Sequence, residues 1–247
     1  MTDAGLRRIM LDRERGADEL LRAALSWLEG NPESLEGVRL TPTLSLLQRT
    51  RPAMAGFTVL AERLERRLAG SEPVGVLQDL IRQHQDASEQ LIENAVALLA
   101  ETAARAVVTL SYSSTVASVI ETAQGRLREV HVLESEPGGE GRRLVRRLRQ
   151  SCPALEGVIA YPDADIGTAV ARSDAGVIGA DTVYEDGSVL NKSGSAALGR
   201  LLGEADKPLY ALATTWKIRT VRRPPDVVDD ALFEHVPAEN ITRIVSE

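Results

Sequence analysis

The stretch VVTLSYSST, residues 107–115, decides the fold, because the pattern of the chain changes there from helical to alternating. Its first four residues are mostly β-branched and apolar, as in a buried strand, and its last five all carry hydroxyl groups. Four similar short runs follow at 130–133, 158–161, 176–178 and 209–212. Strands separated by helix-length connections predict βαβ units and a parallel, doubly wound sheet from about residue 105 to 247.

The chain before residue 105 has a helical pattern. Apolar residues recur there at spacings of three and four, which places them on one face of a helix. Three such stripes lie within residues 17–28, 54–68 and 77–98. No strand pattern interrupts them, so we expect an N-terminal helical domain over residues 1–104 and a second domain over 105–247. The predicted fold class is therefore α/β.

Composition limits the partners that the chain can have. Its 247 residues include Lys+Arg 29 and Asp+Glu 36, a formal net charge of −7, which opposes general affinity for nucleic acid or an anionic membrane. Apolar runs such as 95–100 are much shorter than the roughly 20 residues that span a bilayer. We therefore predict neither nucleic acid nor membrane as a partner.

The chain has a single cysteine, Cys152, and three histidines without paired ligand spacing. One cysteine excludes an intramolecular disulfide, which is typical of a reducing compartment, so we expect a cytoplasmic protein. Cys152 precedes a proline and is interpreted as a small buried apolar residue. The sequence predicts no metal and no cofactor.

Polar segments follow the predicted strands at 110–115, 134–137, 179–181 and 214–217. In a doubly wound sheet the ligand crevice lies at the carboxyl ends of the strands, so these segments are expected at one rim. The serines and threonine at 113–115 are suited either to capping a helix or to binding a phosphate at its N-terminus. Gly138-Gly139-Glu140-Gly141 lacks phosphate-loop spacing and is interpreted as a flexible turn.

The stretch GADTVYEDGSVLNKSGS, residues 179–195, places a lone carboxylate directly after an apolar run. Asp181 has two interpretations, a turn residue at a strand end or an acid/base group in a site for an anionic ligand. Asn191 and Lys192, ten residues later, supply an amide and a cation to such a site. The five arginines between 142 and 149 are interpreted as a solvated helix face.

The segment from Asp181 to Lys192 resembles the signature of the translation initiation factor 2B regulatory subunits. That family also includes 5-methylthioribose-1-phosphate isomerase and ribose-1,5-bisphosphate isomerase. Further matching pieces occur in the right order, so that the resemblance covers essentially the whole chain. They lie at 15–17, 51–52, 109–116, 134–137, 217, 233–237 and 246–247.

The resemblance implies a helical N-terminal domain, a Rossmann-like C-terminal domain and a homodimer or higher homo-oligomer assembled through the latter. It implies that Asp181 acts as acid/base and that a phosphorylated sugar or nucleotide is the ligand. Its contacts would come from Arg15, Gly16, Ala17, Arg51, Asn191, Lys192 and Lys217, beside the hydroxyls of Ser113 and Ser114.

Two positions depart from the isomerases. Ser111 stands where they carry the partner cysteine, and a serine hydroxyl is a far weaker acid than a thiol. Glu136 stands where relatives commonly carry arginine, and a negative charge beside the pocket would weaken phosphate binding.

Three functions follow as hypotheses. The leading one is a binding or regulatory protein for a sugar phosphate or nucleotide, without the isomerase cysteine. The second is an active aldose–ketose isomerase, in which Ser111 or a water assists Asp181. The third is an assembly subunit with a vestigial pocket.

Overall fold

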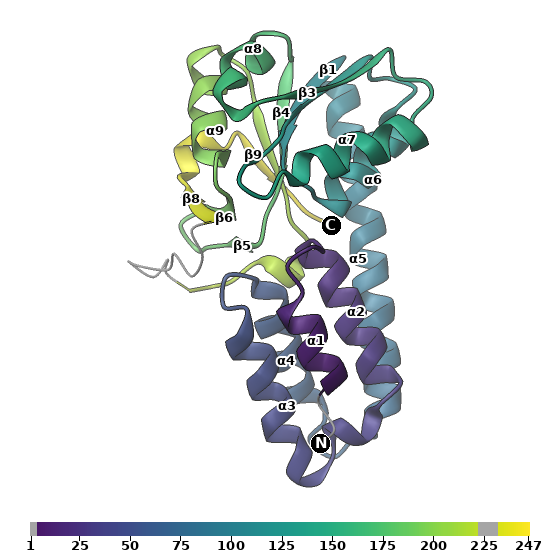
Figure 1. Cartoon of the computed structure of the whole chain (residues 1–247). Helices are drawn as coiled ribbons and strands as arrows, with labels where there is room; N and C mark the ends of the chain where they lie inside the picture. The colour runs from purple at the N-terminus through teal and green to yellow at the C-terminus, as the bar shows by residue number, and fades with distance from the viewer. Residues whose placement is uncertain (1–3, 222–231) are drawn as a thin grey trace.

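A computed structural model describes residues 4–221 and 232–247. The chain begins with helices that lie side by side in a bundle (Figure 1) and bury one apolar core. They are α1 (Ala4–Leu11), α2 (Ala17–Glu29), α3 (Gly37–Thr50), α4 (Ala55–Arg67) and α5 (Pro73–Glu101), with a short 3-10 turn at Pro32–Leu35.

A six-stranded parallel sheet follows, with the order β3-β2-β1-β4-β7-β9. Its strands are β1 (Ala106–Leu110), β2 (Glu129–Leu133), β3 (Gly157–Tyr161), β4 (Ala175–Gly179), β7 (Leu209–Leu212) and β9 (Arg243–Val245). The connections contain α6 (Ser114–Ala123), α7 (Glu140–Ser151), α8 (Ile166–Ala171) and α9 (Ser195–Glu204). Helices therefore alternate with strands as the sequence predicts, and the α/β fold with a Rossmann-like sheet is confirmed.

A small antiparallel sheet lies beside the large one, in the order β5-β6-β8. It consists of β5 (Thr182–Val183), β6 (Val189–Lys192) and β8 (Phe233–Val236). The chain enters this sheet directly from the carboxyl end of β4, so the segment that begins at Asp181 runs from the large sheet into the small one. This arrangement holds Asn191 and Lys192 at the end of β6, near the rim of the large sheet.

The long helix α5 belongs to both halves of the molecule (Figure 1). Its N-terminal residues Leu77 and Leu80 lie in the helical core, whereas Leu91 and Leu98 lie in the core between α6 and the large sheet. Trp216, which follows β7, packs into the helical core and is only 1% exposed. Each core therefore takes side chains from both halves.

The sequence pattern missed α1, α3 and the strands β5, β6, β8 and β9. α3 contains Pro42, which conventionally ends a helix, yet the helix continues because Leu44 and Leu47 bury one face. The small sheet is missed because its strands have two to four residues, too few for a period to be recognised. Within the described ranges, no helix is both long and apolar enough to cross a membrane.

Candidate functional site

The candidate site lies where the strand order reverses, between the carboxyl ends of β1 and β4. Such a switch point leaves a crevice, because the helices that follow the two strands go to opposite faces of the sheet. Gly179 ends β4 so close to α6 that an added Cβ would lie 2.9 Å from the Ser113 hydroxyl. Ser111, just beyond β1, has a φ of 58°, in the left-handed region.

Asp181 lies where two adjoining cavities, of about 100 and 40 Å³, meet. Its backbone is fixed from both sides, since its N–H donates to Leu190 O at 2.9 Å and its carbonyl accepts from Ala55 N at 3.0 Å. The Thr182 hydroxyl reinforces this junction by donating to Ala53 O at 2.9 Å. The start of α4 and strand β6 thus fix the backbone that carries the carboxyl group.

The pKa of Asp181 is raised from 3.8 to about 6. Burial is the main cause, because removing a carboxylate from water disfavours its charged form. The positive charges of Lys217, Lys192 and Arg51 oppose this effect without cancelling it. Asp181 is therefore a carboxyl group that exchanges its proton close to neutral pH, surrounded by cations.

Lys192 and Asn191 are both buried at the end of β6. The Lys192 ammonium lies 2.7 Å from Glu140 Oε1, on the first turn of α7. The Asn191 amide donates to Ser195 Oγ at 2.9 Å, and that hydroxyl donates to Lys192 O at 2.6 Å. These bonds hold the two side chains in the wall of the larger cavity.

Lys217 lies in the smaller cavity, on the 3-10 turn Thr215–Lys217, and is 7% exposed. Within residues 4–221 and 232–247 its ammonium makes no hydrogen bond or ion pair, although it acts electrostatically on Asp18 and Asp181. A nearly buried cation without a direct partner is well suited to binding an anion.

The helical half supplies the opposite wall. Gly16 precedes α2 and Ala17 begins it, and both residues line the cavities. The backbone amides at the N-terminus of α2 therefore lie beside the cavities. The Arg51 guanidinium donates to Met10 O at 2.7 Å and also to Asp12 O, and Arg15 pairs with Asp12 at 2.8 Å. The two arginines therefore fix the loop before α2 as well as lining the cavity.

The structure brings every residue predicted for the site to the lining of these two cavities. The larger one contains Arg15, Gly16, Ala17, Arg51, Ser111, Ser113, Asp181, Asn191 and Lys192, and the smaller one adds Ser114 and Lys217. Ser113 also caps α6 by accepting from Val116 N at 3.3 Å, which is the capping role considered for it.

Two groups in the site, Glu140 and Asp18, were missed by the sequence. Glu140 contacts Lys192, and its segment opens α7 instead of forming a simple flexible turn. Asp18 lines the smaller cavity. Its carboxylate lies 3.0 Å from the Arg22 guanidinium and 3.2 Å from His84 Nε2. Only the position of Glu140 in the connection after β2, with a glycine on either side, could have indicated a pocket residue.

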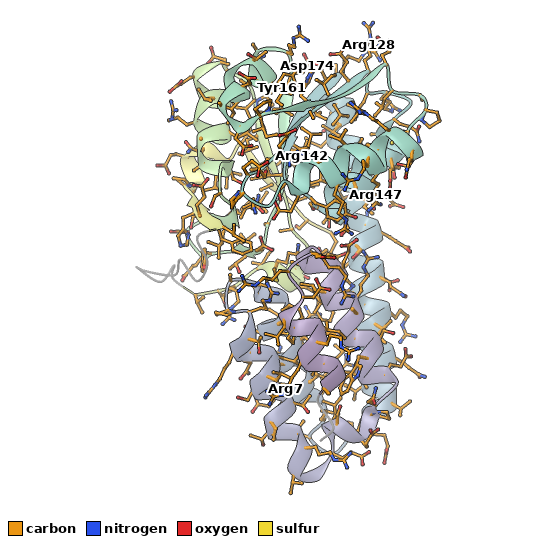
Figure 2. All side chains as sticks on the ribbon, in the orientation of Figure 1. Arg7, Arg128, Arg142, Arg147, Tyr161 and Asp174 are labelled. Carbon is orange, nitrogen blue, oxygen red and sulfur yellow. The ribbon has the colours of Figure 1, made fainter. Side chains whose placement is uncertain are left out.

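The arginines of α7 form a solvated face only in part. Arg142, Arg146 and Arg149 are exposed as predicted, whereas Arg143 and Arg147 are half-buried, and Arg143 joins the sheet half to the helical half. Arg143 stacks over the Tyr112 ring at 3.8 Å and donates to Glu14 O at 2.7 Å, and Arg147 pairs with Glu121 at 2.8 Å. Figure 2 marks Arg142 and Arg147 along this helix. The spacing of the arginines does not reveal the contacts of Arg143 and Arg147, because their acidic partners, Glu19 and Glu121, are distant in the sequence.

Glu136 does not line either cavity, contrary to the concern that it opposes phosphate. It pairs with Arg142, which also binds Glu134 at 2.8 Å, outside the pocket. Cys152 is buried in the core between α7 and the sheet, where burial raises the pKa of its thiol. It lines neither cavity and cannot serve as the partner of Asp181.

No group of three or more His, Cys, Asp or Glu side chains suited to a metal ion occurs among the residues that the structure describes.

Comparisons with known proteins give a consistent assignment. The model of the Initiation factor 2 subunit family matches residues 17–247. An eIF-2B subunit 2-like translation initiation factor from Pyrococcus horikoshii is 27% identical over 267 residues, which cover 98% of this chain and 93% of that protein. A ribose 1,5-bisphosphate isomerase from Archaeoglobus fulgidus is 30% identical over 142 residues, 56% of this chain and 44% of that protein.

Solved structures agree with this fold. The Pyrococcus horikoshii OT3 translation initiation factor eIF-2B superimposes with a TM-score of 0.84 at 25% identity, covering 98% of this chain and 93% of that chain. A chain of the tetrameric eIF2B-beta2-delta2 complex from C. thermophilum gives 0.76 at 16% identity, covering 99% and 88%, and supports the fold alone.

Proposed function

Because this chain belongs to the Initiation factor 2 subunit family, we propose that it binds a sugar phosphate or a nucleotide around Asp181 as a regulatory protein. The observation that carries the proposal is the surroundings of that carboxyl group. Lys192, Lys217 and Arg51 act on it electrostatically from three separate elements, and the N-termini of α2 and α6 lie beside it. This combination favours a phosphorylated ligand with a hydroxyl near Asp181.

The regulatory role is proposed because the second proton carrier of an isomerase is missing. Ser111 lines the cavity where the family's enzymes are expected to carry cysteine, and Cys152 lies elsewhere in the core. A serine hydroxyl without an adjacent base does not exchange protons at neutral pH as a thiol does. We therefore propose binding without turnover.

Thermal unfolding with and without ligands tests binding, because a ligand that binds only the native state raises the midpoint. The set is ribose 1,5-bisphosphate, methylthioribose 1-phosphate and nucleoside monophosphates. We expect a shift with at least one of them, lost in Lys217→Met. Lys207→Met is the matched control, because Lys207 bonds to carbonyls of α8 outside the cavities. No shift at millimolar concentrations would favour an assembly subunit with a vestigial pocket.

A second candidate, an aldose–ketose isomerase, is favoured by the pKa of Asp181 at about 6, which suits a group that gives and takes protons. Ketose formation, followed by NMR with ribose 1,5-bisphosphate, tests it. Turnover by the wild-type chain that is abolished in Asp181→Asn would overturn the regulatory proposal. Turnover that is absent from the wild type and appears in Ser111→Cys would support the regulatory proposal.

We also propose that the chain forms a homodimer through residues 105–247 and works in the cytoplasm. The family membership supports the assembly, and the lone buried cysteine agrees with a reducing compartment. Light scattering coupled to size exclusion tests the first part, and a monomer across micromolar concentrations would contradict it.

A further inference from the structure

We propose that Glu140 makes this pocket select a monophosphate and reject a ligand that carries a second phosphate. The inference rests on the proposed function and specifies its ligand class. It follows from a difference in charge between the two ends of the site, one at Lys217 and the other at Lys192.

The Lys217 end is prepared for an anion. Besides Asp181, the smaller cavity is lined by the carboxylate of Asp18, which is already engaged by Arg22 at 3.0 Å and lies 3.2 Å from His84. Lys217 itself makes no direct polar contact with any residue that the structure describes, and Ala17 and Ser114 lie in the same cavity at the starts of α2 and α6. An ammonium and two helix N-termini together provide a site for one phosphate.

At the Lys192 end three cations are already engaged. Lys192 pairs with Glu140, Arg15 pairs with Asp12, and Arg51 donates to backbone carbonyls of the loop before α2. The Lys192 ammonium lies 2.7 Å from Glu140 Oε1, and the side chains are only 9% and 25% exposed. A phosphate placed here would meet a carboxylate at close range, and in a partly buried site that repulsion is little screened. The pair therefore offers no net positive charge for a second phosphate.

Glu140 also has unused hydrogen-bonding capacity. Its Oε2 atom is buried and has no hydrogen-bond partner within the described parts of the chain. Buried polar atoms are normally satisfied, so this oxygen requires a donor. A ligand hydroxyl or amine is a donor, whereas a phosphate dianion offers only acceptors. The far end of the ligand should therefore carry hydroxyl or amine groups.

The backbone fixes Glu140 in this position. Gly139 precedes it with a φ of 63°, which glycine adopts without strain. Gly141 follows it so close to β2 that an added Cβ would overlap the carbonyl oxygen of Leu133. Glu140 is the first residue of α7, where the helix dipole favours a carboxylate. The glutamate thus reaches the cavity from a rigid helix start.

Isothermal titration calorimetry of the full chain tests the inference. It measures the affinities for ribose 1-phosphate, ribose 5-phosphate and ribose 1,5-bisphosphate. We expect the wild type to bind one of the monophosphates at least about tenfold more tightly than the bisphosphate, and Glu140→Gln to improve bisphosphate affinity about tenfold or more. Glu136→Gln is the matched control, since it makes the same change four residues away in a glutamate that pairs with Arg142 outside the cavities. It should retain the wild-type preference.

Bisphosphate binding by the wild type that is as tight as monophosphate binding would overturn the inference and leave the proposed function standing. A folded Glu140→Gln protein that keeps the wild-type preference for a monophosphate would also overturn the inference and leave the proposed function standing. If Glu140→Gln does not fold, the ratio of monophosphate to bisphosphate affinity in the wild type alone tests the inference. Failure of all three ligands to bind either protein would overturn both the inference and the sugar-phosphate form of the proposed function.

Discussion

Asp181 is held in the native state at an energetic cost. Its pKa of about 6 exceeds the ordinary 3.8, so the native state binds a proton more tightly than the unfolded chain does. The contribution of this group to stability is therefore complete below about pH 4 and is lost as the pH rises through about 6. At pH 8 the charged carboxylate lowers the unfolding free energy by up to about 3 kcal/mol.

Asp181→Asn should remove this cost. We expect the variant to be more stable than wild type at pH 8 by about 2 kcal/mol, and the two proteins to converge near pH 4, as measured by urea unfolding. Asp165→Asn, at an exposed carboxyl group, is the control and should change little. A loss of stability in Asp181→Asn at pH 8 would show that the cations outweigh burial.

At this scale the sequence predicted the residues of the site better than their partners. Asp181, Asn191, Lys192 and Lys217 were recognised from strand ends and from the family resemblance, and they lie around the same cavities. Their roles in binding remain predictions. Glu140 was missed because its contact with Lys192 joins residues that are far apart in the chain, and no local pattern encodes such a pair.

Helix α2 is joined to α5 by the carboxylate of Asp18. Burial alone would raise the pKa of Asp18, but the contact with His84 at 3.2 Å and the positive charges of Lys217 and Arg22 outweigh it and lower the pKa to about 2. A carboxyl group with a lowered pKa stabilises the fold above about pH 4, and this stabilisation is lost as the pH falls through about 2.

Asp18→Asn should therefore destabilise the protein at pH 7 by about 2 kcal/mol, and the difference from wild type should shrink as the pH approaches 2. Denaturant unfolding across this range measures it. Asp86→Asn on the exposed face of α5 is the matched control. A constant difference at all pH values would mean that packing, not the ion pairs, is responsible.

The junction between β2 and α7 depends on Gly141. Gly141→Ala should lower the unfolding free energy by about 2 kcal/mol or more, because the new Cβ meets a backbone carbonyl that cannot move freely. Gly75→Ala, at an exposed helical position with open space around it, should stabilise the protein slightly. Thermal unfolding of both variants makes the comparison, and equal effects would contradict the overlap at Gly141.

Elements were predictable in proportion to their length and periodicity. The stripes of α2, α4 and α5 and the first five strands of the large sheet all carried a clear pattern. α3 contains a proline that weakens the helical pattern, and the small sheet consists of strands too short to show alternation. Tertiary packing determines those elements, so a single sequence contains too little information about them.

The whole molecule should unfold as one unit, because its two halves share core residues. Trp216 from the sheet half packs among the helices, and Leu91 and Leu98 of α5 pack beneath the sheet. We expect coincident urea transitions by tryptophan fluorescence, which reports mainly on the helical half, and by far-UV circular dichroism, which reports on the whole chain. Two separated transitions would show that the halves are independent.

Helix α5 also restricts how this protein can diverge. One face of it must fit the helical bundle near its start and the α6 layer near its end, so a change in its length or phase would misalign two interfaces at once. An insertion of one residue near its middle would rotate the later half by about 100° relative to the earlier half. We expect recombination between relatives to keep this helix intact, with crossover points falling in the surface loops on either side.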